Sequence, residues 1–496
     1  MGLAAWVQQR YVLYLMLFLA VLNMYTMRVC LSVAIVQMAH AEPSGDNATE
    51  AVDPERCPEN PQQGDGGPSL TPQPDAAAEF AWDSVLQGFI LSSFYYGYVV
   101  SHLPGGVFAD RFGGKHALGL GLLITSLTTL LSPPAARLGA GWLITLRVFM
   151  GLGEGVTFPA ISALLSQWVP PKQRSRVGAF VYAGGQLGTV LGNAISGLLL
   201  HNFDWPITFY FFGLLGVIWY VLWVALCFST PNQHPFISAK EREYLNEHIM
   251  PASKQAFQVR TPWRGILTSL PVWGLVVIQV GHDWGFFTML TDLPKYMRSV
   301  LRFDIATNGV LSSLPYLTMW VMSLGMSAIA DWLLVRNILT LLQVRRVFTS
   351  IDVLAASLVC AAGMIGASCA GCNWRLAVGL LTAGLGGMAA AFSGMRVNAL
   401  DLTRNHAGTV MALVNGGGAV SGIVSPMIIG LLTPHETMAE WRLTFWVVFV
   451  VLVVTNFIYV AVARAEIQPW DAAEDAVEEV ADEKTPPVRP ARLRSP

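Results

Sequence analysis

The apolar part of the segment from Arg147 to Arg176 carries two charged residues, Arg147 and Glu154, at positions where they could do chemistry. Charged side chains inside a segment long enough to cross a bilayer are costly and are usually retained for a function. Glu154 follows Arg147 by seven residues, close to two helical turns. Both side chains are therefore expected on nearly the same helix face, about 10 Å apart along the axis.

A third buried charge, Arg28, lies within the first apolar run. A guanidinium pairs with carboxylate or phosphate through two donors, so Arg28 is the first candidate to bind an anionic substrate. The alternative is a structural ion pair with Glu154. Arg147 either attracts anions at the mouth of a cavity or pairs with Glu154. Glu154 is the candidate proton carrier, because burial and a nearby arginine act on its pKa in opposite directions; a structural role is the alternative.

His282 and Asp283 are adjacent polar residues in the middle of a later apolar run, and they are candidates for substrate binding and ion coupling respectively. Because they are neighbours, only one can face a cavity squarely. At about 1.5 Å per residue, Arg28 and Glu154 lie roughly 15 and 18 Å from the outer ends of their runs. His282 lies about 17 Å from the inner end of its run. The sequence thus predicts a site near the bilayer midplane, where transporters bind substrate.

The elements that must position these residues are membrane helices. The chain has 496 residues, of which 53% are hydrophobic and 12% charged, and its mean hydropathy is +0.50. Soluble domains carry about 25% charged residues, so the composition indicates a multi-pass membrane protein. The net charge of −2 identifies no partner, because the charges are segregated by side, and we expect no nucleic-acid binding.

We predict twelve spans of roughly 20 residues or more, which give two six-helix bundles and an all-α membrane fold. The spans are 11–38, 84–109, 116–133, 142–169, 177–200, 207–229, 271–297, 308–330, 349–368, 374–397, 408–433 and 442–463. A short N-terminus (1–10) precedes an N-terminal bundle (11–229), which a flexible loop (39–82) interrupts. A linker (230–270), a C-terminal bundle (271–463) and a disordered tail (464–496) are expected to follow.

Basic residues outside the spans favour one side of the membrane when both termini are cytoplasmic. The loop 39–82 then lies on the extracellular or lumenal side, and its Asn47-Ala48-Thr49 sequon is a candidate glycosylation site. No sorting signal is evident, so a plasma membrane and a lysosomal or vesicular membrane both remain open.

Cysteine spacing predicts no metal site, because Cys369 and Cys372 lack two further ligands nearby. A disulfide among Cys57, Cys369 and Cys372 stays open.

An aspartate stands at the inner end of a span in each half of the chain. Asp110 and Arg111 lie in G-G-V-F-A-D-R-F-G-G-K, and Asp331 lies in S-A-I-A-D-W-L-L-V-R six spans later. Basic residues follow each aspartate, so these residues can pair across helix ends and latch an inner gate. The alternative is a generic turn with positive charges on the inner side.

With twelve spans, a six-plus-six division and this motif, the chain resembles a transporter of the major facilitator superfamily. R-V-C-L-S-V-A from Arg28, G-L-G-E-G-V-T-F-P-A from Gly151 and Q-P-W from Gln468 resemble one family within it. That family contains sialin, the vesicular glutamate transporters and the type I sodium/phosphate cotransporters. The run G-H-D-W-G-F-F-T-M-L-T-D-L-P-K-Y-M is most similar to invertebrate putative inorganic phosphate cotransporters.

The resemblance implies transport of organic or inorganic anions coupled to protons, sodium or membrane potential. It implies that Arg28 contacts the anion and that Glu154 takes part in proton coupling. Cys30 replaces the family's asparagine, Ser162 and Met150 replace a histidine and an acid of sialin, and Leu91 and His282 replace a histidine and an arginine of the glutamate transporters. These departures argue against a glutamate-specific transporter.

We therefore expect a secondary active symporter of a small anion, without enzyme activity or a cofactor, driven by H⁺ or Na⁺. The lipid bilayer and the anion are its expected partners, and we expect a monomer. The alternatives are a sodium-dependent inorganic phosphate cotransporter and, from another class, an anion channel.

Overall fold

The computed structural model describes residues 8–39, 79–170, 173–253, 262–301, 303–350, 373–389, 395–403 and 407–471. Throughout these residues the regular secondary structure is helical, and the one extended contact is an isolated bridge between Ala39 and Phe80. The expected all-α membrane class is therefore confirmed.

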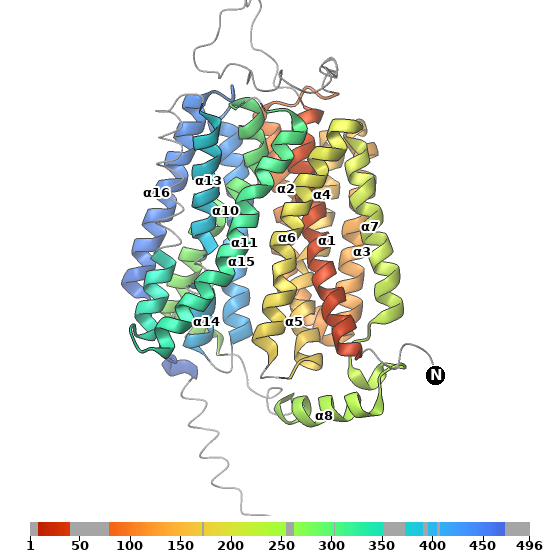
Figure 1. Ribbon diagram of the computed structural model, residues 1–496, viewed down its shortest axis with the longest axis vertical. Helices are drawn as coiled ribbons and strands as arrows, with labels where there is room; N and C mark the ends of the chain where they lie inside the picture. The colour runs from red at the N-terminus through yellow and green to blue at the C-terminus, as the bar shows by residue number, and fades with distance from the viewer. Residues whose placement is uncertain are drawn as a thin grey trace, which may run out of the picture.

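The first half of the chain forms one bundle, coloured from red to yellow-green in Figure 1. Its helices are α1 (Gln9–Met38), α2 (Ser84–Phe112), α3 (Gly114–Leu138), α4 (Ala140–Gly155), α5 (Thr157–Trp168), α6 (Arg174–Asn202) and α7 (Pro206–Leu226). The second bundle, coloured green to blue, contains α10 (Leu270–Ser299), α11 (Ile305–Val335), α13 (Trp374–Met388), α14 (Met395–Leu402), α15 (Ala407–Leu432) and α16 (Met438–Val462). Between them lie η4 (Pro231–Gln233), α8 (Ala239–Ser253) and α9 (Trp263–Thr268).

The expected spans coincide with described helices or pairs of helices, except 349–368, which lies almost wholly outside the described residues. By length and composition, 7 of the described helical segments could cross a membrane. The expected span 142–169 is divided at Val156 into α4 and α5. Pro159 explains the division, because it has no N–H to donate to the Gly155 carbonyl one turn earlier.

The surface of α7 shows how these helices meet their surroundings. Leu214, Ile218 and Val221 are 55%, 49% and 62% exposed, whereas Gly213 and Gly216 are buried against α3. Small residues let the two helices approach closely, and the large apolar side chains point away from the protein. This arrangement suits a helix that faces lipid on one side.

The bundles meet most extensively along two helix pairs, α2 with α15 and α6 with α11, and α1 also contacts α10. We call the face where α1 begins and α8 lies the α8 face, and the opposite face, which carries Phe80 and the turn 433–437, the loop face (Figure 1). Backbone approaches between the bundles gather toward the loop face. An added Cβ at Gly88, Gly309 or Gly430 would come within 2.6 Å of a carbonyl oxygen of the other bundle.

The linker helix α8 is attached to the start of α1. Glu241 accepts hydrogen bonds from the backbone N–H groups of Gln9 and Arg10, at 3.0 and 3.1 Å. The first N–H groups of a helix lack partners within the helix and carry partial positive charge, so a carboxylate satisfies them well. The linker is thereby held under the first bundle.

The expected disorder of the tail 464–496 does not extend to its first residues. The Gln468 N–H donates to the carbonyl of Leu402, the last residue of α14, at 2.9 Å. Thr403 donates to Asp471 at 2.8 Å, and Asp471 is fully buried. The segment 464–471 thus satisfies a carbonyl at a helix end that would otherwise lack a partner.

Several expectations fall outside the described residues. They concern Asn47, the loop 40–78, the cysteines Cys57, Cys369 and Cys372, and the tail beyond residue 471. Asp110 and Arg111 lie near the end of α2 and Asp331 lies in α11, but their side chains are also outside the description. The inner gate therefore stays a prediction.

Candidate functional site

The structure brings two of the predicted site residues together, Arg28 of α1 and Glu154 of α4. The Nε and Nη2 atoms of Arg28 donate to Glu154 Oε2 at 3.1 and 2.5 Å. Arg28 is 6% exposed and Glu154 is fully buried. This is the ion pair that the sequence offered as the alternative to substrate binding, and it joins two residues that are 126 positions apart in the chain.

Aromatic rings surround the Arg28 guanidinium. Its Cζ lies 4.8, 4.6 and 5.3 Å from the ring centroids of Tyr25, Phe94 and Tyr98. A desolvated guanidinium gains about 2 kcal/mol or more over an aromatic face. We call these three rings the aromatic cage. Tyr25 lies about one helical turn before Arg28, and Phe94 and Tyr98 are one turn apart on α2.

Arg147 is a second buried cation near the same ring. It is 4% exposed, and its Cζ lies 5.4 Å from the centroid of Phe94. Its Nη1 contacts the Met150 sulfur at 3.5 Å, and its Nε has no hydrogen-bond partner. Within the described part of the chain no acidic side chain forms an ion pair with Arg147. The proposed pairing of Arg147 with Glu154 is therefore not seen.

Glu154 retains one oxygen without a partner. Both Arg28 hydrogen bonds end on Oε2, while Oε1 is buried and accepts no hydrogen bond. A buried acceptor without a donor is unfavourable, and a proton on that oxygen would reduce the cost. The carboxylate can therefore hold Arg28 with one oxygen and bind a proton on the other.

His282 and Asp283 lie on α10 in the second bundle, and both are buried, at 1% and 7% exposure. Asp283 Oδ1 accepts from Gln279 Nε2 at 2.8 Å. Gly418 of α15 packs against both of those side chains, since an added Cβ there would lie 2.6 Å from Gln279 Cγ and 3.1 Å from Asp283 Cγ. Gly418 thus makes room for Asp283, because a small residue lets two helices pack closely.

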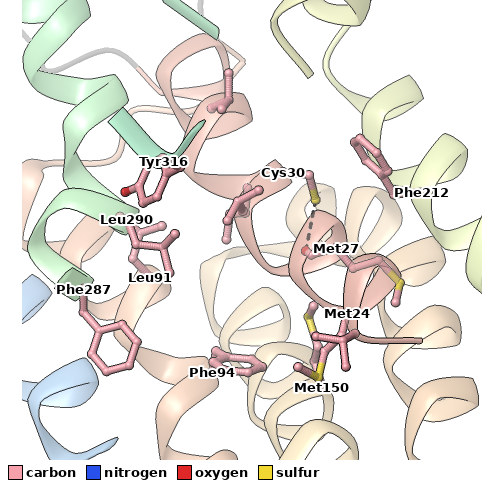
Figure 2. Packing of buried hydrophobic residues seen from close by; sticks show 14 of the residues in the cluster. Met24, Met27, Cys30, Leu91, Phe94, Met150, Phe212, Phe287, Leu290 and Tyr316 are labelled. Atoms are coloured by element: carbon pink, nitrogen blue, oxygen red, sulfur yellow. Dashed lines mark hydrogen bonds between the residues drawn. The ribbon is translucent and has the colours of Figure 1, made fainter. Parts of the chain in front are cut away.

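The two halves of the site are joined by aromatic contact. The rings of Tyr95 on α2 and Phe287 on α10 lie 4.7 Å apart. Phe287 is one helical turn beyond Asp283, and Tyr95 is next to Phe94. Leu91 and Leu290 belong to the same buried cluster (Figure 2). Asp283 therefore lies within a turn of the contact between α10 and the helix that carries the aromatic cage.

Sequence reasoning missed the aromatic cage and Met150 as a neighbour of Arg147. The available signal was weak, because an aromatic residue in a membrane helix is more often a packing residue. The spacing of Phe94 and Tyr98, four residues apart, places them on one face of α2, but only the fold shows that Arg28 lies against that face. Among the described residues no group of three or more His, Cys, Asp or Glu side chains could hold a metal ion.

Comparison with known proteins identifies the relatives of this chain. The model of the Major Facilitator Superfamily matches residues 17–426. Human sialin is 39% identical over 465 residues, which cover 93% of this chain and 90% of sialin. A putative inorganic phosphate cotransporter of Drosophila melanogaster is 37% identical over 491 residues, covering 98% of this chain and 90% of that protein.

Solved structures share the fold. A bacterial homolog to the human lysosomal transporter Spinster, in an inward-facing and occupied conformation, aligns with a TM-score of 0.65 at 12% identity. The alignment covers 92% of this chain and 97% of the homolog. This likeness supports the architecture of two helical bundles.

Proposed function

Since the chain belongs to the major facilitator superfamily, and within it to the family of sialin and the phosphate cotransporters, we propose that it moves a small organic or inorganic anion across a membrane by cation symport. Sialin and its relatives are membrane transporters, which supports a non-enzymatic role. We propose that the α8 face is cytoplasmic and that the membrane is lysosomal or vesicular, or the plasma membrane.

The observation that carries this proposal is the excess of positive charge at the site. Arg28 and Arg147 are both buried, and Glu154 is their one described acidic neighbour, bonded to Arg28. A buried charge without a partner is strongly unfavourable. An anion bound between the arginines would supply the missing negative charge, with Arg147 as its first contact.

Coupling follows from competition for Arg28. Glu154 occupies the Nε and Nη2 donors of Arg28. A carboxylate or phosphate that reaches this edge of the guanidinium replaces Glu154 there, because one edge pairs with one anion at a time. Glu154 then lacks its cation in an apolar site and takes a proton, beginning at Oε1. Anion and proton are thereby bound together, and the bundles rock about the occupied site.

The second candidate is sodium-dependent transport of inorganic phosphate. It is favoured by Asp283 and Gln279, whose buried oxygen atoms are of the kind that coordinate hard cations. In that case Asp283 holds the coupling ion, and Glu154 is a structural partner of Arg28.

Uptake into proteoliposomes tests the proposal. Labelled phosphate and labelled sialic acid are offered without sodium, under an imposed acid gradient. Accumulation that a protonophore abolishes supports proton symport. Accumulation that requires sodium supports the second candidate. Absence of uptake for both anions under either gradient contradicts the assignment to these two substrates.

Two substitutions separate the roles at the site. Glu154→Gln imitates the protonated carboxyl, so it should abolish gradient-driven accumulation while anion exchange continues. Arg147→Gln removes the unpaired cation, so it should lower anion affinity by about tenfold or more. Arg442→Gln, at an exposed arginine of α16, is the matched control and should leave gradient-driven accumulation and anion affinity unchanged. If the Glu154→Gln protein still accumulated the anion fully, Glu154 would be excluded as the proton carrier.

A further inference from the structure

Three polar side chains meet where the bundles touch at the loop face. The Lys295 Nζ of α10 lies 3.1 Å from Glu436 Oε1 and donates to the Ser84 Oγ at 3.1 Å. The Ser84 hydroxyl in turn donates to Glu436 Oε1 at 3.2 Å. Ser84 begins α2 in the first bundle, whereas Lys295 and Glu436 belong to the second. We call these three residues the latch.

The latch is largely removed from solvent. Lys295 is 5% exposed and Ser84 is 2% exposed, and the Glu436 side chain is 16% exposed. Lysine is rarely buried so completely without a paired acid. The ion pair satisfies the charges, and the hydroxyl from the opposite bundle adds a hydrogen bond to each of them.

The turn that carries Glu436 is fixed in an uncommon conformation. Glu436 has a φ of 55°, in the left-handed region that residues with a Cβ seldom adopt. The next residue, Thr437, caps α16 in a capping box with Glu440. Conformations of this kind persist where the surrounding structure requires them, and they gather at functional sites.

Below the latch the bundles are in close contact. Gly430 of α15 packs against the Ser84 carbonyl, and Gly88 of α2 packs against the Pro426 carbonyl. About two turns beyond Gly88 along α2, the apolar contact between Tyr95 and Phe287 follows. A polar layer and then an apolar layer thus separate the loop face from the aromatic cage around Arg28.

We propose that the latch holds the bundles together at the loop face and so keeps a gate closed there. This gate opens and closes once in each transport cycle. The proposal rests on the alternating-access function proposed above. When the bundles separate at the loop face, Ser84 leaves and water takes its place. Lys295 and Glu436 remain paired, because both are carried by the second bundle.

This division of the latch between the bundles makes it reversible. A latch with a positive charge on one bundle and a negative charge on the other would have to separate these charges when it opens. In a poorly solvated interface that separation costs much free energy. Here opening removes two hydrogen bonds to a neutral hydroxyl, which water can replace. Ser84 therefore sets how often the gate opens without controlling whether the ion pair survives.

Cysteine accessibility tests the latch. Leu91 lies on α2 about two turns below Ser84 and is 2% exposed, so a Leu91→Cys reporter is shielded while the gate is closed. In proteoliposomes without substrate, a membrane-impermeant thiol reagent is added on the side of the loop face, and the protein without the reporter gives the background. We expect Ser84→Ala to raise the labelling rate by about tenfold, because it removes the two hydrogen bonds that Ser84 makes to the second bundle.

Two controls separate the latch from general loosening. Ser84→Thr keeps the hydroxyl and should label at the rate of the Leu91→Cys protein in which Ser84 is intact. Ser313→Ala removes a buried hydroxyl of α11 whose one hydrogen bond within the described part of the chain goes to the Val310 carbonyl of its own helix, so it should leave the rate unchanged. An unchanged rate in Ser84→Ala, or an equal increase in Ser313→Ala, overturns the proposal.

A second variant covers the case in which Ser84→Ala does not fold. Glu436→Ala removes the oxygen that accepts the Ser84 hydroxyl, so one hydrogen bond between the bundles is lost and the reporter should again label faster. An unchanged rate overturns the latch. The labelling needs no transported anion. Absence of anion uptake with latch-dependent labelling would therefore overturn the proposed function alone, and normal uptake with latch-independent labelling would overturn the latch alone.

Discussion

Two nitrogens of Arg28 reach one carboxylate oxygen of Glu154, and three rings hold the guanidinium from other directions. The geometry depends on the planar fork of arginine, since an ammonium has no second donor in that plane. The charge of the residue alone therefore does not define the site.

We expect Arg28→Lys to keep the protein folded but to raise the KM for the anion by about tenfold or more, because a lysine keeps the charge and loses the fork. Initial rates of uptake over a range of anion concentrations measure this, with Arg442→Lys as the exposed control. An unchanged KM would show that Arg28 serves the ion pair and does not bind substrate.

His234 lies in the linker, outside the membrane-spanning helices, and its protonation state depends on the groups around it. It is 2% exposed, its Nδ1 accepts from the Phe236 N–H at 3.1 Å, and its Nε2 lies 3.2 Å from the Leu226 carbonyl. A neutral ring with its proton on Nε2 satisfies both contacts. Burial lowers the pKa of His234 below its ordinary value of 6.5.

The stability that depends on neutral His234 is present above the unfolded pKa and is lost as the pH falls through the lower folded pKa. We expect the thermal unfolding midpoint in detergent to fall between about pH 7 and pH 5, and to fall less in His234→Asn, whose amide oxygen still accepts from Phe236. His116→Asn, at an exposed histidine, should follow the parent protein. If the unfolding midpoint fell equally with pH in the parent protein and in His234→Asn, this expectation would be contradicted.

At the scale of elements, α2 and α4 approach each other through glycine. Gly151 packs against the backbone of Phe94 and Tyr98, and Gly97 packs against the backbone of Val148 and Leu152. This close approach puts the cage residues of α2 beside the charged residues of α4. Side chains between the helices would hold the two halves of the site apart.

Gly151→Ala should therefore destabilise the first bundle, by roughly 1–3 kcal/mol, and weaken anion binding. Gly141→Ala in the same helix is the matched control, because an added Cβ there meets nothing within 4 Å and favours the helix. Thermal unfolding in detergent and anion binding to the purified protein give the two measurements. Equal stability of the two variants would contradict the close packing of α2 on α4.

At the scale of the whole molecule, the bundles touch most closely near the loop face, which defines one state of the transport cycle. An added Cβ at Gly309 of α11 would lie 2.6 Å from the Asn193 carbonyl and 2.7 Å from the Gly197 Cα on α6. These contacts cross between bundles, so they must separate when the loop face opens.

Gly309→Ala should disfavour closure of the loop face and slow anion exchange, while each bundle remains folded. Gly325→Ala lies in the same helix with nothing within 4 Å of its added Cβ, so it should exchange at the parent rate. Exchange of labelled anion between preloaded proteoliposomes and medium is the measurement. A Gly309→Ala protein that exchanges normally would show that this contact is dispensable for the cycle.

Much of the architecture followed from local patterns. Apolar runs of sufficient length predicted the described helices, and charges inside those runs identified Arg28, Arg147, Glu154, His282 and Asp283. The division of 142–169 at Val156 was not anticipated, although Pro159 carried the signal. The packed start of the tail was missed as well, because its contacts with Leu402 and Thr403 join residues that are far apart in sequence.

The sequence by itself determined the membrane class, the family and the presence of costly charges in apolar helices, because these depend on composition and on spacing within single segments. Only the tertiary structure decided which charges pair. Glu154 is seven residues from Arg147 and 126 residues from Arg28, yet it bonds to Arg28. Residues two turns apart on a helix share a face without touching, whereas helix packing brings side chains from α1 and α4 into contact. The same reason placed Ser84 on Lys295 and Glu436.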